Sequence, residues 1–240
     1  MFNRILLSNN HEFEQVVNVE LHDVCLNWAR ETALNKLSNT ADTWQNRHPN
    51  AKVMDLLYGD YAKNLVKAYI TTNIDNITII EYDLIRHDDF VNSDLYDLKI
   101  GNDEIEVKSS LEKNSRNLET INRDRNIIIN QHISHITRSR YIFQVFFVPR
   151  NLGNFISMEN INTSLNGTFN QNLFNQHLEE FNLSNIDIYI CGWIDNSQQI
   201  SNGSFSVSNY NTGASRRNYA RMPIRQSNNP RDFLELLING

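Results

Sequence analysis

Apolar residues recur at helical spacing over the first 70 residues of the chain. Between residues 11 and 37 they lie three or four positions apart, which predicts an amphipathic helix built on Val16, Val17, Leu21, Val24, Cys25, Trp28 and Ala29. A second helix is expected over residues 53–70, where Gly59 interrupts the pattern. The polar stretch between them, residues 38–50, contains Pro49 and is typical of a loop.

The pattern then changes to strand periodicity. Residues 77–85 alternate between apolar and polar positions, and residues 94–110 are typical of a hairpin. Residues 118–136 favour a helix, and two apolar, β-branched runs at 141–148 and 186–194 favour buried strands. Shorter helices are expected over residues 172–181 and 230–238.

This order of elements predicts one α/β domain spanning residues 1–240, with a mixed sheet flanked by helices. Its core, about residues 53–194, runs helix, three strands, helix, strand. A helical addition at residues 1–50 precedes the core, and a second addition at residues 197–240 follows it. Trp28, Trp193 and the two cysteines, Cys25 and Cys191, are expected to be buried.

The hairpin carries the residues of chemical interest. A two-residue turn at Gly101-Asn102 places Asp97 opposite Glu106, and Lys108 lies two residues further along the same face. The apolar residues Leu98, Ile105 and Val107 then point to the other face, into a core. Two facing carboxylates repel each other unless a cation lies between them. Mg²⁺ suits such a pair, because it prefers oxygen ligands and needs only one or two carboxylates.

Asp97, the triplet Glu106-Val107-Lys108 and the following Ser109-Ser110 resemble the signature of the PD-(D/E)xK nuclease superfamily. Tyr96 stands where the family name has proline. The resemblance is specific over residues 97–110 and extends to the order of elements over about residues 53–194. It implies a restriction-endonuclease-like fold, with Asp97, Glu106 and the Val107 carbonyl as ligands of Mg²⁺ and Lys108 as the catalytic lysine.

Members of this superfamily often carry one more acid on the helix before the first strand. Asp60 is the candidate here, and Asp55 is the alternative. Glu81 and Asp83 alternate outward on the first predicted strand and are not expected to be ligands. Two histidines near the end of the second core helix, His132 and His135, are not assigned to a metal either.

Charge is distributed unevenly along the chain, whose formal net charge is −6. Residues 107–150 hold 8 basic residues against 3 acidic ones, and residues 216–240 hold 5 arginines against 2 acids. We expect these segments to form a basic cleft that binds DNA through two groups of arginines, Arg116, Arg123 and Arg125 in the first and Arg216, Arg217, Arg221 and Arg225 in the second.

Together these features predict a cytoplasmic, Mg²⁺-dependent type II restriction endonuclease that cuts double-stranded DNA at specific sites as a homodimer. No nucleotide cofactor and no membrane contact are expected. Three other functions stay open: a repair or recombination nuclease of the same superfamily, a DNA-binding module without catalysis, and an unrelated cytosolic α/β enzyme. The last has no nucleophile elbow or dinucleotide-binding loop to support it.

Overall fold

The computed structural model describes residues 1–39, 49–90, 94–132, 135–136, 139–151, 168–197, 206–212 and 215–239. Side chains are described within these ranges except at 38–39, 128–136 and 206–220. The expected loop at residues 38–50 therefore lies largely outside them. The chain forms a mixed α/β fold, in agreement with the predicted class.

A seven-stranded sheet forms the centre of the molecule, with strand order β1-β2-β9-β8-β5-β4-β3. Its strands are β1 (Phe2–Leu6), β2 (Glu12–Val16), β3 (Ile79–Glu81), β4 (Leu98–Ile100), β5 (Asp103–Leu111), β8 (Tyr141–Pro149) and β9 (Ile186–Asp195). Only β5 and β8 pair in parallel, and the other neighbours are antiparallel. A second, antiparallel sheet has the order β10-β11-β6-β7, from β10 (Ser206–Thr212), β11 (Ser215–Pro223), β6 (Asn126–His132) and β7 (His135–Ile136).

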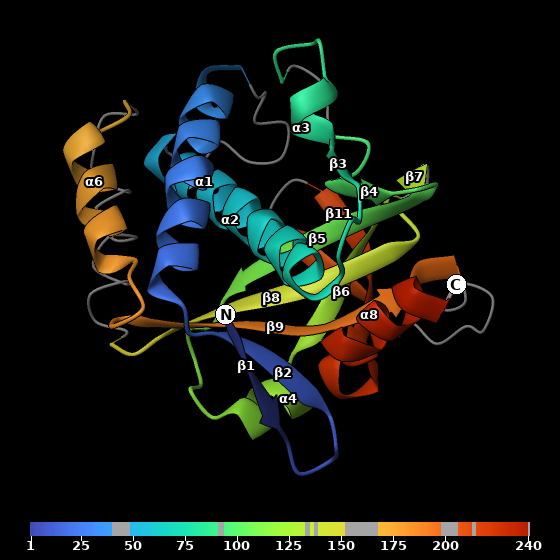
Figure 1. Cartoon of the computed structure of the whole chain (residues 1–240). Helices are drawn as coiled ribbons and strands as arrows, with labels where there is room; N and C mark the ends of the chain where they lie inside the picture. The colour runs from blue at the N-terminus through green and yellow to red at the C-terminus, as the bar shows by residue number, and fades with distance from the viewer. Residues whose placement is uncertain are drawn as a thin grey trace.

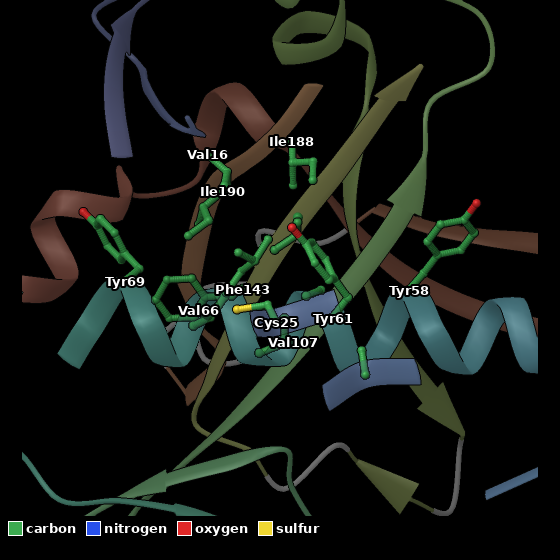
Figure 2. Close-up of a cluster of buried hydrophobic side chains, with 14 of the residues drawn as sticks. Val16, Cys25, Tyr58, Tyr61, Val66, Tyr69, Val107, Phe143, Ile188 and Ile190 are labelled. Carbon is green, nitrogen blue, oxygen red and sulfur yellow. The ribbon is translucent and has the colours of Figure 1, made fainter. Parts of the chain in front are cut away.

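Two long helices, α1 (Val19–Asn39) and α2 (Pro49–Asn73), cover one face of the seven-stranded sheet, which we call the helical face (Figure 1). α6 (Gln171–Glu180) lies beside α1, and α8 (Pro230–Asn239) covers the same face near the C-terminus. Figure 2 shows part of the core between α2 and the sheet, to which Val107, Phe143 and Ile190 belong.

The opposite face, which we call the β11 face, packs against β6, β11, the short helix α4 (Leu118–Asp124) and the 3-10 turn η1 (Ile224–Gln226). Buried side chains of β8 alternate between the two faces: Phe143 and Val145 belong to the helical face, whereas Ile142 and Phe146 belong to the β11 face. All nine residues of β8 are buried, as expected for a central strand.

The predicted helix over residues 11–37 is wrong at its start. Glu12–Val16 forms β2, which pairs with both β1 and β9, and the helix begins only at Val19. Asn18 caps this helix, because its side chain accepts a hydrogen bond from the Leu21 N–H at 2.7 Å. The N-terminal addition therefore contributes two strands to the sheet rather than helix alone.

Two further predictions need correction. The strand expected over residues 77–85 is limited to β3, and residues 82–85 form a one-turn helix, α3 (Tyr82–Ile85). The helix expected over residues 118–136 ends at Asp124, and β6 follows it because Ile127 is buried on the β11 face. The remaining predicted helices and strands are confirmed. Cys25, Cys191 and Trp193 are buried, whereas Trp28 is only half-buried.

Candidate metal and catalytic centre

The hairpin of β4 and β5 has the predicted register. Leu98 pairs with Ile105, Lys99 with Glu104 and Ile100 with Asp103. Gly101 takes φ +58° at the turn, a conformation that glycine adopts at little steric cost. The buried Leu98, Ile105 and Val107 belong to the helical face, as expected. Local turn chemistry therefore fixes which side chains of β5 point the other way.

Asp97 departs slightly from the predicted register. Its N–H donates to the carbonyl of Ile105 at 3.0 Å, although Ile105 is already the partner of Leu98. Asp97 and Leu98 thus both lie opposite Ile105, as two residues oppose one at a β-bulge. The Asp97 side chain still reaches β5, where its Oδ2 accepts a hydrogen bond from the Val107 N–H at 2.6 Å. Asp97 is held beside the Glu106-Val107 peptide by this contact.

Glu106 and Lys108 lie two residues apart on β5 and form an ion pair between the Lys108 ammonium and Oε1 of Glu106. Their partners across the parallel ladder are Ile142 and Gln144 of β8. Ile142 belongs to the β11 face, so the alternation of β5 places Glu106 and Lys108 on that face too. The three predicted residues are therefore brought together by two adjacent strands.

The surroundings of Asp97 disfavour its ionised form. Burial and the nearby Glu106 carboxylate raise the pKa of Asp97 from 3.8 to about 8, while the hydrogen bond from Val107 acts against this rise. The Lys108 pKa is also raised: burial lowers it, but the charges of Glu106 and Asp97 more than compensate. Lys108 therefore remains an ammonium at neutral pH.

These residues fit a divalent ion such as Mg²⁺. Asp97 and Glu106 offer carboxylate oxygens, and the strained state of two close carboxylates is relieved by a cation. Within the described ranges, no group of three or more His, Cys, Asp or Glu side chains is arranged to hold a metal. A site here would thus use two carboxylates, a backbone carbonyl and water, which is the ligand set that Mg²⁺ accepts.

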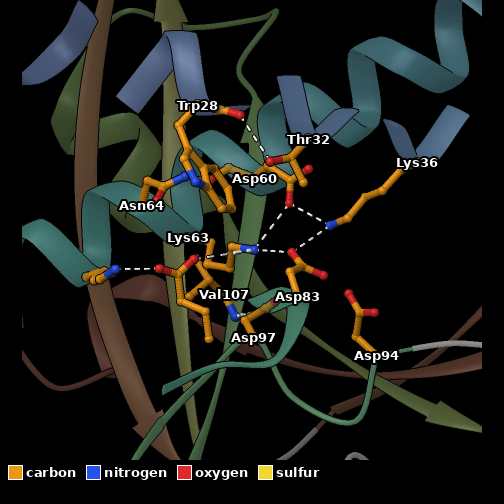
Figure 3. Close-up of polar contacts among 12 residues, drawn as sticks. Trp28, Thr32, Lys36, Asp60, Lys63, Asn64, Asp83, Asp94, Asp97 and Val107 are labelled. Atoms are coloured by element: carbon orange, nitrogen blue, oxygen red, sulfur yellow. Dashed lines mark hydrogen bonds and ion pairs between the residues drawn. The ribbon is translucent and has the colours of Figure 1, made fainter. Parts of the chain in front are cut away.

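Asp60, the predicted helix acid, lies on α2 in a separate cluster of buried charges (Figure 3). It pairs with Lys36 at 2.7 Å and with Lys63 at 3.4 Å. Burial raises its pKa, and the two lysines act against that rise. Both ammonium groups pair with Oδ1 of its carboxylate, whereas Oδ2 is buried and accepts no hydrogen bond. The alternative, Asp55, is exposed on the same helix.

Glu81 and Asp83 do not point outward as expected; the side chains of both are buried. Glu81 pairs with Lys67 and lies 3.9 Å from Lys63, and Asp83 pairs with Lys36 and Lys63. Sequence periodicity could not reveal this, because residues 82–85 are helical and the lysines come from distant α1 and α2.

The two predicted arginine groups come from neighbouring elements on the β11 face. α4 packs against η1 and β11, and the Ile224 N–H donates to the Arg125 carbonyl at 3.0 Å. Arg116 and Arg225 are exposed. Arg123 is exposed and pairs with Asp124, whereas the Arg125 guanidinium holds the buried Glu112.

The rest of the second group lies on β11. Arg221 is exposed, and Arg216 and Arg217 lie in β11 at positions whose side chains fall outside the described set. The structure therefore brings both groups to one face but leaves the expected cleft untested.

Gln144 is a residue of this region that the sequence pattern did not single out. It is fully buried in the apolar strand β8, beside Lys108, and its amide nitrogen donates to Ser110 Oγ at 3.2 Å and to the Val145 carbonyl at 3.0 Å. A polar residue inside an otherwise apolar run is a signal available in the sequence, because burying an amide is unfavourable without partners.

Comparison of the chain with protein-family models, with curated proteins and with solved structures finds no match in any of the three. Within the described ranges, no helix is long and apolar enough to cross a membrane.

Proposed function

We propose that the chain is a Mg²⁺-dependent endonuclease of double-stranded DNA with a restriction-endonuclease-like fold. One observation carries the proposal: Asp97, just before β4, lies beside Glu106 and Lys108 of β5, and Glu106 and Lys108 point to the sheet face on which α4, β11 and η1 pack. The order α2, β3, α3, β4, β5, α4, β6, β7, β8 contains the helix, three strands, helix, strand sequence expected of a PD-(D/E)xK core, with α3 inserted between the first two strands and β6 and β7 before the last one.

The chain's own residues have distinct roles in this proposal. Asp97, Glu106 and the Val107 carbonyl would hold Mg²⁺, which when bound polarises a phosphate oxygen and lowers the pKa of water. The Val107 N–H donates to Oδ2 of Asp97, so Oδ1 would be the oxygen available to a metal ion. Lys108 is cationic, so it stabilises negative charge on the phosphate by donating hydrogen bonds rather than by accepting a proton.

Binding of DNA rests on the arginines of α4, β11 and η1. Exposed guanidinium groups contact phosphates and read guanine edges, and neither role requires the metal. By the family resemblance, the additions outside the core favour a type II restriction enzyme acting as a homodimer on two-fold symmetric sites, without a nucleotide cofactor.

Plasmid cleavage tests this function. The wild-type protein should convert supercoiled DNA into discrete fragments in Mg²⁺ and should leave it intact in EDTA. Asp97→Asn, Glu106→Gln and Lys108→Met should each reduce cleavage by at least about a hundredfold while DNA binding persists. Glu104→Gln is the matched control, because Glu104 lies on the same strand face two residues from Glu106 and should keep its activity.

Each alternative gives a different result. Cleavage confined to branched or damaged DNA, with intact plasmid left uncut, indicates a repair or recombination nuclease. Tight DNA binding without cleavage in Mg²⁺ or Mn²⁺ indicates a binding module. A folded Lys108→Met variant that cuts at the wild-type rate contradicts the catalytic assignment.

A further inference from the structure

The metal-binding candidate Asp97 lies at the end of a 16-residue connection, residues 82–97, that joins β3 to β4. This connection begins with α3, a single helical turn with no side-chain cap. One turn has too few internal hydrogen bonds to be stable alone, so α3 must be held by other contacts. The described contacts identify what holds it.

Asp83 attaches α3 to the two long helices. Its side chain is buried, and Oδ2 accepts hydrogen bonds from the ammonium groups of Lys36 on α1, at 2.9 Å, and Lys63 on α2. The same two lysines also pair with Asp60, which gives a closed arrangement of two cations and two carboxylates (Figure 3). Each of the four side chains pairs with two partners of opposite charge, although Asp60 Oδ2 and Asp83 Oδ1 are buried and accept no hydrogen bond.

Tyr82, the first residue of α3, contacts Asp97. Its N–H donates to the Asp97 carbonyl at 3.3 Å, which continues the register of β3 and β4, where Glu81 pairs with Leu98. The Tyr82 ring packs edge-to-face on Tyr96 at a centroid distance of 5.2 Å. On its other side the Asp97 N–H is bonded to Ile105, so the backbone of Asp97 is fixed between α3 and β5.

A second tether acts on the same connection. The buried Arg86 guanidinium pairs with Asp94, three residues before Asp97, and with Asp88 at 2.6 Å. It also lies 3.7 Å from Oδ1 of Asp83. Arg86 therefore links Asp94, near the end of the connection, to Asp83, near its start.

We propose that Asp83 is a positioning residue for Asp97: by binding Lys36 and Lys63 it fixes α3, and α3 fixes the Asp97 backbone for divalent-ion binding. This inference rests on the function proposed above. Asp83 is assigned to positioning rather than to metal binding because Lys36 and Lys63 share its Oδ2 and Arg86 lies 3.7 Å from its Oδ1. Residues that support a metal ligand commonly change metal affinity by about 10- to 100-fold when they are replaced.

Calorimetric titration with Mn²⁺ on the DNA-free protein tests the inference without using activity, since Mn²⁺ accepts the same carboxylate and carbonyl ligands. Asp83→Asn should weaken Mn²⁺ binding by about tenfold. Asp97→Asn serves as the reference for loss of the site. Asp75→Asn, an exposed Asp after α2, is the matched control and should bind as the wild type does.

Asp83→Asn leaves two buried ammonium groups with fewer carboxylates, so the variant can lose stability for that reason alone. The double variant Lys36→Met/Asp83→Asn removes one charge of each sign and restores neutrality. We expect it to melt near the wild-type temperature and still to bind Mn²⁺ about tenfold more weakly. That combination separates positioning of Asp97 from support of the fold.

The outcomes are distinct. Wild-type affinity for Mn²⁺ in a folded double variant overturns the inference and leaves the proposed function standing. Absence of Mn²⁺ binding by the wild-type protein overturns the metal site itself, and this inference with it. Weak binding by the double variant, with Asp75→Asn unchanged, supports the positioning role.

Discussion

Replacing Asp97 by Asn should stabilise the metal-free protein at high pH. The folded environment raises the pKa of Asp97 from 3.8 to about 8, mainly through burial and through the Glu106 carboxylate. A folded protein that holds a proton more tightly than the unfolded chain is most stable below the unfolded pKa. This part of the stability is lost as the pH rises from about 4 to about 8.

The size of the effect follows from the shift. A change of about 4 pKa units corresponds to roughly 6 kcal/mol at pH 9. Because the Asp97 carboxylate is only half-buried, solvent screening reduces this free energy. We therefore expect the free energy of unfolding of Asp97→Asn at pH 9 to exceed that of the wild type by about 3 kcal/mol. For a chain of this size, that gain raises the melting temperature by about 6–12 °C. The amide oxygen of the introduced side chain can still accept the hydrogen bond from the Val107 N–H, so the hairpin is retained.

Thermal unfolding in EDTA at pH 5 and pH 9 measures the effect, with Asp75→Asn as the control. At pH 5 the difference between Asp97→Asn and the wild type should fall below about 1 kcal/mol, because the folded wild type is then protonated. Adding Mg²⁺ at ten times its dissociation constant should stabilise only the wild type, by about 1.4 kcal/mol. An Asp97→Asn variant that melts at or below the wild-type temperature at pH 9 refutes the idea of a strained carboxylate pair.

Three further variants test other parts of the structure. Burial lowers the pKa of His177 to about 4, so the free energy of unfolding should fall by up to about 3 kcal/mol as the pH drops from 6.5 to 4. His177→Gln should make this pH dependence of the unfolding free energy, measured by urea unfolding, less steep. Gly192→Ala should lower the melting temperature by several degrees, because its φ is +155° and the added methyl would lie 2.9 Å from a backbone oxygen at Asn228. Gln144→Leu should keep the melting temperature within about 3 °C yet reduce plasmid cleavage at least tenfold, if the amide orients Lys108; unchanged cleavage assigns Gln144 to packing alone.

The hairpin could be predicted because its determinants are local. Gly101 supplies the positive φ, strand alternation assigns the faces, and both lie within 12 residues of sequence around the site. β2 was missed because Phe13 and Val16 suit a helix and a strand equally, and pairing with β9, some 175 residues away, decides between them. Periodicity carries no information on such distant pairing.

The side chains around Asp97 also depend on contacts between residues that are distant in sequence. Asp83 is buried because Lys36 and Lys63 reach it from α1 and α2, 47 and 20 residues away in sequence. Nothing in the local pattern distinguishes it from a solvated acid on an outer strand position. Gln144 differs, since a lone amide within the run Tyr141–Pro149 was visible and could have been singled out.

Net charge alone would argue against a DNA partner, yet part of the negative charge is paired inside the protein. Buried acids such as Asp60 and Asp83 are neutralised by lysines inside the protein and contribute little field outside it. Exposed acids of α1, among them Glu20 and Glu31, lie over the helical face, opposite α4 and η1. Under the proposed function, DNA would approach the β11 face, on which α4, β11 and η1 lie and to which Glu106 and Lys108 point. An overall charge of −6 therefore does not by itself exclude the proposed DNA binding, because the local charge of the binding face affects association more than the net charge does.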